Sequence, residues 1–81
     1  MNTAMLLAAR FNGPTVPLES ISEEFLGIER KKALELARLG TLPFPATRLG
    51  RTQNAPWLVH VDDLGKALDD AFKEARAACT L

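Results

Sequence analysis

Residues that end helices divide this chain into short segments. Gly13-Pro14, Gly27 and the proline-rich run 42–45 separate stretches whose apolar residues recur at helical spacing. Glycine readily adopts the positive φ at which many helices end, and proline cannot continue a helix. Because the chain has 81 residues, a fold of such short elements encloses one thin core and forms a single domain.

The first segment is almost wholly apolar. Asn2 or Thr3 is a suitable N-cap, residues 4–9 are mostly strong helix formers, and Gly13 supplies the positive-φ stop. A short helix that is apolar nearly all round must be covered by the rest of the chain or by a partner. We therefore expect this helix to be part of the core or of a dimer surface.

Two further helices are separated by a tight glycine turn. Residues 15–17 are predicted to be extended, because Val16 precedes a proline. A helix then begins at Pro17, with apolar residues on one face, and Gly27 ends it. A third, basic helix is predicted from about Ile28 to Leu39. Two short helices joined in this way, the second of them basic, are typical of a helix-turn-helix.

A β-hairpin and a last helix follow. Residues 46–49 can form one strand, residues 50–56 are rich in turn formers, and residues 57–61 are the clearest strand in the sequence. Asp62 is predicted to cap the final helix, in which apolar residues recur at helical spacing as far as Ala75.

The order helix, helix, helix, hairpin, helix is that of a winged helix-turn-helix. We predict a mainly α fold with a small β-hairpin, in which one winged helix-turn-helix DNA-binding domain spans residues 1–81. Its helix-turn-helix covers about 17–40, its wing about 45–61 and its C-terminal helix about 62–77. The predicted core consists of the large apolar side chains Leu6, Ile21, Phe25, Leu36, Trp57, Val59, Leu64, Leu68 and Phe72.

The charges are segregated along the chain, although the net charge is zero at pH 7. Residues 28–53 carry six Lys or Arg against two Glu, a balance of +4, and the segments on either side each carry −2. In a winged helix the basic helix enters the major groove of DNA and the hairpin contacts the backbone or the minor groove. We therefore expect double-stranded DNA to be bound by Arg30, Lys31, Lys32, Arg38, Arg48, Arg51, Thr52, Gln53 and Asn54. The alternative is that these side chains are solvated and have no partner.

No arrangement of residues indicates catalysis. His60 and Asp62 are expected to form a structural pair. The doublets Asp62-Asp63 and Asp69-Asp70 lie on a predicted helix, where neighbouring residues diverge by about 100° and cannot chelate a metal together. Trp57 is expected to anchor the core rather than to stack on a base. We expect no enzyme activity, no catalytic residue, no metal and no cofactor.

Cysteine content and hydropathy bound the cellular setting. Cys79 is the only cysteine, which excludes a disulfide within the chain and favours a reduced, cytoplasmic location. The longest apolar run, Ala4 to Ala9, is far shorter than the roughly 20 residues of a membrane span. The start of the chain also lacks the basic region of a signal peptide.

Two groups of known proteins share motifs with this sequence. The Leu-Pro-x-Pro run 42–45, then Arg48, Trp57 and Asp63-Leu64 before an amphipathic helix, resembles the winged-helix group of excisionases and MerR-type proteins. A second set of motifs extends from residue 1 to about 72. It begins with Met-Asn-Thr and an apolar helix that ends near Asn12-Gly13, followed by Val16-Pro17-Leu18-Glu19 and Phe25-Leu26-Gly27. It continues with the same Leu-Pro-x-Pro run and Arg48, and ends with Gln53, Ala55-Pro56-Trp57 and residues 59–64. By these motifs the chain is similar to the pyocin activator protein family of bacterial and prophage transcription regulators.

This resemblance implies a sequence-specific transcriptional activator of bacteriocin or prophage genes. Such a protein binds promoter DNA, with RNA polymerase as a further possible partner. A domain of this size reads few base pairs alone, so we expect a homodimer or tandem assembly on DNA, formed through the first or last helix. The resemblance does not cover residues 28–32, so it implies no target sequence. Two alternatives are an excisionase-like factor that bends DNA for recombination and a protein-interaction module that does not bind DNA.

Overall fold

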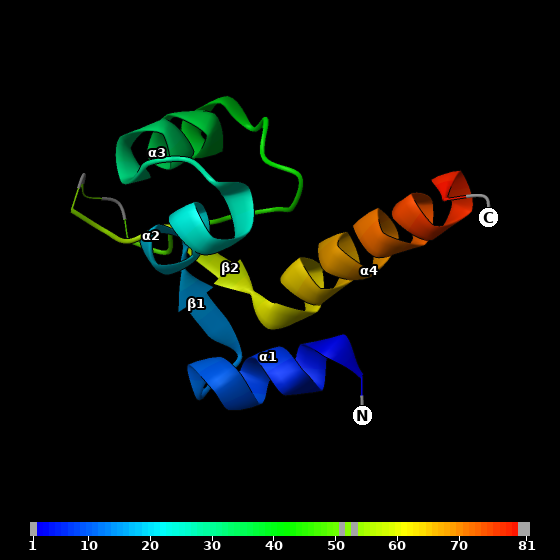
Figure 1. The fold of residues 1–81 in the computed structure, drawn as a ribbon. Coiled ribbons are helices and arrows are strands. Elements are labelled where there is room, and N and C mark those ends of the chain that lie inside the picture. The colour runs from blue at the N-terminus through cyan, green and yellow to red at the C-terminus, as the bar shows by residue number, and fades with distance from the viewer. Residues whose placement is uncertain (1, 51, 53, 80–81) are drawn as a thin grey trace.

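The computed structural model describes residues 2–50, 52 and 54–79. In chain order the elements are α1 (Thr3–Phe11), β1 (Thr15–Pro17), α2 (Leu18–Ile21), the π-helical turn η1 (Ser22–Leu26), α3 (Arg30–Leu39), β2 (Leu58–His60) and α4 (Val61–Ala78). The small sheet lies between α1 on one side and α2 with α3 on the other, and α4 projects from the body (Figure 1). The predicted mainly α single domain with a small antiparallel sheet is confirmed, and this arrangement is consistent with a winged helix-turn-helix.

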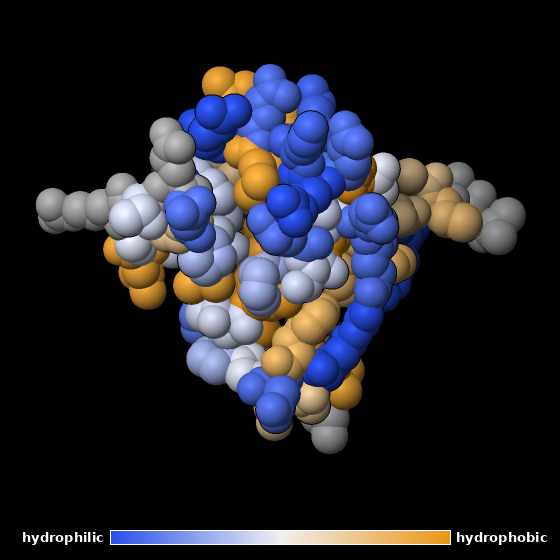
Figure 2. Space-filling view, turned by 90° about the vertical axis from the view of Figure 1, so that its left-hand side faces the viewer, coloured by the Kyte–Doolittle hydropathy of each residue, from blue (hydrophilic) through white to orange (hydrophobic). Residues whose placement is uncertain are grey.

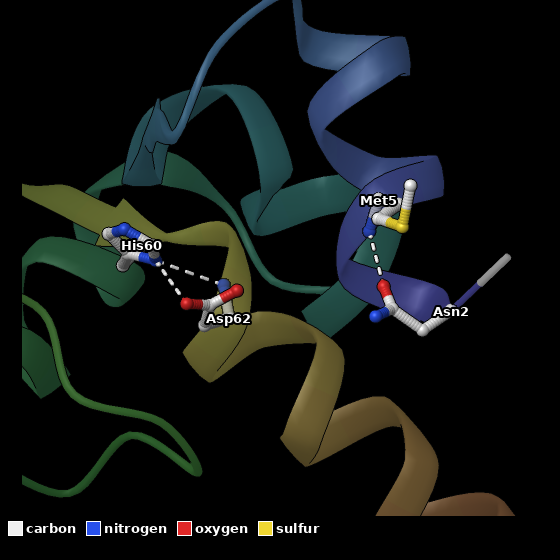
Figure 3. Close-up of polar contacts among 4 residues, drawn as sticks. All are labelled: Asn2, Met5, His60 and Asp62. Atoms are coloured by element: carbon white, nitrogen blue, oxygen red, sulfur yellow. Dashed lines mark hydrogen bonds and ion pairs between the residues drawn. The ribbon is translucent and has the colours of Figure 1, made fainter.

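An asparagine caps each end of α1, Asn2 at the start and Asn12 at the end. The Asn2 side chain accepts a hydrogen bond from the Met5 N–H at 2.8 Å, as expected of an N-cap (Figure 3). At the other end the residue with positive φ is Asn12, at 59°, rather than the predicted Gly13. Asparagine is among the few residues that tolerate this conformation, and the Gly13 N–H then bonds to the Ala8 carbonyl at 3.0 Å.

The first helix of the predicted helix-turn-helix is irregular. After one turn of α2 the chain widens into η1, where the buried Ser22 hydroxyl donates to the Glu19 carbonyl at 3.3 Å. Gly27, with φ of 67°, ends η1, and α3 begins at Arg30 rather than at Ile28. The predicted helix, turn and basic helix are therefore present. The start at Pro17 is corrected, because Pro17 belongs to β1 and its extended backbone precedes α2.

The sheet pairs strands that are distant in the sequence. β1 and β2 are antiparallel, with Thr15 opposite His60, Val16 opposite Val59 and Pro17 opposite Leu58. The expected pairing of 46–49 with 57–61 is reduced to one bridge, between Thr47 and Leu58. The difference has a physical reason: in the Thr47–Leu58 register the next hydrogen-bonded pairs would be Pro45 with His60 and Leu49 with Pro56, and a proline has no N–H to donate. On the other edge of β2, Val16 and Val59 face the core together and are 1% and 0% exposed.

The core surrounds the sheet, where α1 and the start of α4 pack on one side and α2 with α3 on the other. Its buried members are Leu7, Val16, Leu18, Ile21, Ala33, Ala37, Phe44, Val59, Val61 and Leu64. Three predicted core residues, Ile21, Val59 and Leu64, are among them, while Phe25, Leu36, Trp57 and Leu68 are half-buried. Leu6 and Phe72 were wrongly predicted, since they are 54% and 58% exposed.

The last helix starts one residue earlier than predicted. α4 begins at Val61, and His60 is its N-cap, because the His60 Nδ1 accepts the Asp62 N–H at 3.0 Å (Figure 3). Asp62 and Asp63 therefore occupy the first turn, where the helix dipole favours negative charge, and the predicted Asp62 cap is corrected. None of the described helices is long and apolar enough to cross a membrane.

Candidate nucleic-acid interface

A groove runs between α3 and the loop that precedes β2. Its volume is about 910 Å³, and it is lined by Glu19, Arg30, Lys31, Leu34, Glu35, Arg38, Arg48, Asn54, Ala55, Pro56 and Trp57. Hydrophilic side chains gather over the upper part of this side of the molecule, where α3 lies (Figure 2). The basic helix and the loop therefore share one concave surface.

Helical periodicity explains which side of α3 faces the groove. The buried Ala33 and Ala37 attach the helix to the core, and the stripe next to them faces the groove. Arg30, Leu34 and Arg38 recur at spacings of four, which places them on one stripe. The sequence therefore directs two arginines of one helix toward the same surface.

The Thr47–Leu58 bridge positions the loop side of the groove. Two backbone hydrogen bonds of 2.9 and 2.7 Å hold this pair. The next pair toward the connecting loop is therefore Arg48 and Trp57, which lie opposite each other. The Arg48 guanidinium carbon is 4.9 Å from the centroid of the Trp57 ring, a cation–π distance. The half-buried Trp57 thus packs against the core and also contacts the Arg48 guanidinium.

The groove brings together five of the nine predicted DNA-binding residues: Arg30, Lys31, Arg38, Arg48 and Asn54. Lys32 is exposed on α3 and Thr52 is exposed in the loop, but neither lines the groove. Arg51 and Gln53 lie outside the described residues. The structure thus places these five residues on one surface, which α3 and the loop share.

Two acidic residues of the groove were missed by sequence reasoning. Glu19, at the start of α2, approaches Arg30 with its Oε1 3.6 Å from the Arg30 Nε, and Glu35 lines the same groove. The sequence offered no signal for the first contact, because it depends on how α2 and α3 pack. Among the residues that the structure describes, four basic and two acidic side chains line the groove.

A second charged cluster joins α1 to η1. Arg10 and Glu24 form an ion pair, and the Arg10 guanidinium carbon is 4.9 Å from the Phe11 ring centroid and 5.6 Å from that of Phe25. The hydrogen bond between the two side chains raises the pKa of Arg10 and lowers that of Glu24. This cluster lies outside the groove and connects α1 to η1.

The acidic residues of α4 have local partners. Asp62 contacts His60 mainly through its backbone: its N–H donates to the His60 Nδ1, and its Oδ2 lies 3.6 Å from the same nitrogen. Asp69 accepts a 2.5 Å hydrogen bond from the Thr3 hydroxyl, and Lys66 donates to Asp70 at 2.9 Å. That hydrogen bond raises the pKa of Lys66. In the part of the chain that the structure describes, no group of three His, Cys, Asp or Glu is arranged to hold a metal ion.

Comparison with known proteins yields one match. The family model described as Pyocin activator protein PrtN matches residues 3–75, which include α1, α2, η1, α3, both strands and most of α4. No curated protein and no solved structure matches the chain.

Proposed function

The chain belongs to the pyocin activator protein family, and we propose that it activates pyocin-like bacteriocin or prophage genes by binding specific promoter DNA. Membership in the family supports a role as a transcriptional activator of pyocin genes. DNA binding is the mechanism that we infer for that role. The observation that carries the inference is the groove, where basic residues of α3 and of the loop meet on one surface.

The chemistry of the groove suits a nucleic-acid duplex. Arginine is the side chain that most often contacts guanine edges in the major groove, and a helix of the size of α3 fits that groove. We assign Arg30, Lys31 and Arg38 to the major groove. Arg48 and Asn54, from the loop, are assigned to phosphates or base edges beside it.

The remaining predicted residues extend this surface. Lys32, Arg51, Thr52 and Gln53 lie within three positions of groove residues in the sequence and are assigned to flanking phosphates. The protein acts in the cytoplasm, where its promoters and RNA polymerase are found. Binding to repeated promoter boxes is expected to need two copies, because one small domain reads few base pairs.

Fluorescence anisotropy tests the proposal. The ligands are labelled duplexes from upstream of the bacteriocin and prophage genes of the source genome, with shuffled duplexes of equal composition, at salt concentrations of about 50 to 300 mM. With roughly four to six phosphate contacts, the slope of log K against log salt is expected to be about −4 to −5. Arg38→Glu is expected to abolish specific binding. Lys73→Glu is the matched control, because Lys73 is exposed on α4 and does not line the groove.

Three outcomes separate the proposal from its alternatives. Binding that is insensitive to salt, or equal for promoter and shuffled duplexes, contradicts recognition of promoter DNA. Intact function after charge reversal at Arg38 and Arg48 favours a protein-interaction module. Specific binding with strong bending but without activation of a promoter reporter favours an excisionase-like factor.

A further inference from the structure

The C-terminal half of α4 forms an exposed helical arm. Every residue from Asp69 to Cys79 is exposed, and the arm leaves the body on the side away from the groove-lining loop (Figure 1). Its length is about three turns, or roughly 16 Å. A helical segment this short gains little stability from its own hydrogen bonds in water, so a contact that covers one face would stabilise it.

The apolar stripe of α4 continues along this arm. Leu64 is buried in the core and Leu68 packs against it half-buried. Ala71, Phe72 and Ala75 extend the same stripe at spacings of three and four residues. Phe72 is 58% exposed, so the largest side chain of the arm has most of its apolar surface in water. The stripe that attaches α4 to the core is thus uncovered further out.

The charges beside the stripe fit a second copy of the same arm. Asp69 and Arg76 are seven residues apart, which places them on one edge of the helix. Asp69 accepts the Thr3 hydroxyl with its Oδ1, and the Arg76 guanidinium carbon lies 5.9 Å from the centroid of the Phe72 ring. When two arms pack antiparallel with their midpoint beside Phe72, Arg76 of each copy lies opposite Asp69 of the other. Charges that flank an apolar helix seam in this way favour one orientation of the pair. The surface is complementary to itself, as a two-fold dimer requires.

We propose that two copies of this chain dimerise through antiparallel packing of their α4 arms, with Phe72 at the centre and two Asp69–Arg76 ion pairs along one edge. An interface of two short arms is smaller than the standard size, so we expect a dissociation constant in the micromolar range. No residue of α4 lines the groove, so the groove stays accessible in both copies. The proposal does not depend on what the groove binds.

Sedimentation equilibrium of the full chain without DNA, from about 1 µM to about 1 mM, measures this association. Phe72→Lys is expected to raise the dissociation constant about tenfold or more. Because the Phe72 side chain is exposed, the fold of the variant is retained, which circular dichroism verifies. Leu39→Lys is the matched control: Leu39 is 66% exposed on α3, and its replacement is expected to change the constant by less than about twofold.

Two charge-reversed variants test the orientation. In homodimers of Asp69→Lys, the new lysine faces Arg76 of the other copy, and in homodimers of Arg76→Glu, the new glutamate faces Asp69. Each variant alone is expected to associate about tenfold more weakly than the wild type. In an equal mixture both ion pairs form again between unlike chains, so association is expected to return to the wild-type level.

Any of three results overturns the proposal. The first is a wild-type chain that stays monomeric up to about 1 mM. The second is a dimer that Phe72→Lys weakens no more than Leu39→Lys does. The third is a mixture of the charge-reversed variants that associates no more tightly than each variant alone.

Discussion

The turn between η1 and α3 rests on one glycine, and its replacement gives the sharpest stability prediction. Gly27 has φ of 67°, and a Cβ built there would meet no atom within 4 Å. Gly27→Ala therefore adds backbone strain without a steric clash. For an L-residue other than glycine, the left-handed conformation costs about 1–2 kcal/mol. In a domain of this size that cost lowers the melting temperature by about 4–16 °C.

Thermal and urea unfolding, followed by circular dichroism, measure this change. Gly13→Ala is the matched control, because a Cβ at Gly13 also meets no atom within 4 Å and its φ is not positive. That variant is expected to be unchanged or up to about 1 kcal/mol more stable, since alanine restricts the unfolded chain. A G27A variant that melts within about 2 °C of the wild type, or no lower than G13A, would refute the left-handed turn.

Three further predictions concern the core, the α1–η1 cluster and the groove. Ile21 is fully buried, so Ile21→Ala is expected to lower the free energy of unfolding by about 2–5 kcal/mol in urea titrations, and a loss below about 1 kcal/mol contradicts that packing. Arg10 lowers the pKa of the Glu24 carboxyl through a hydrogen bond. The ion pair therefore stabilises the fold above pH 4.5, the ordinary pKa of glutamate, and this stabilisation is lost as the pH falls through the lower pKa of the folded state. Unfolding curves of Glu24→Gln should therefore show a weaker loss of stability in acid than the wild type. Arg48→Gln is expected to reduce the salt slope of DNA binding by about one, whereas an unchanged slope places Arg48 away from phosphate.

Most helices could be predicted from the sequence, because helix caps, glycine turns and apolar periodicity depend on residues only a few positions apart. The glycine turn at Gly27, the Asn2 cap and the periodic stripe of α4 each follow from neighbours in the sequence. The sheet did not follow, because β1 and β2 are far apart in the sequence and their antiparallel pairing depends on the tertiary fold. The exposed Phe72 was missed for a related reason: apolar periodicity shows which side of a helix is apolar but does not show what covers it.

The candidate site, too, was predicted in its local features and missed in those that depend on tertiary packing. Sequence charge and element order predicted that α3 and the loop share a surface, and the spacing of Arg30 and Arg38 already places these two on one helix face. Glu19 could not be predicted as their neighbour, because it reaches the groove only through the packing of α2 on α3. The contact of Arg48 with Trp57 depends on the single Thr47–Leu58 bridge, which is too short to give a clear strand pattern.

The neutral net charge of the chain does not argue against a polyanionic ligand. Three aspartates of α4 have neighbours within the fold: Asp62 lies beside His60, Asp69 accepts the Thr3 hydroxyl, and Asp70 accepts the Lys66 ammonium. The groove carries four basic side chains, and only Arg30 among them has an ion pair with a groove carboxylate, at 3.6 Å. Attraction to a phosphate backbone depends on the field at the contact surface, and salt screens more distant charges beyond about 10 Å. The spatial separation of the charges, rather than their sum, therefore decides whether this fold can bind DNA.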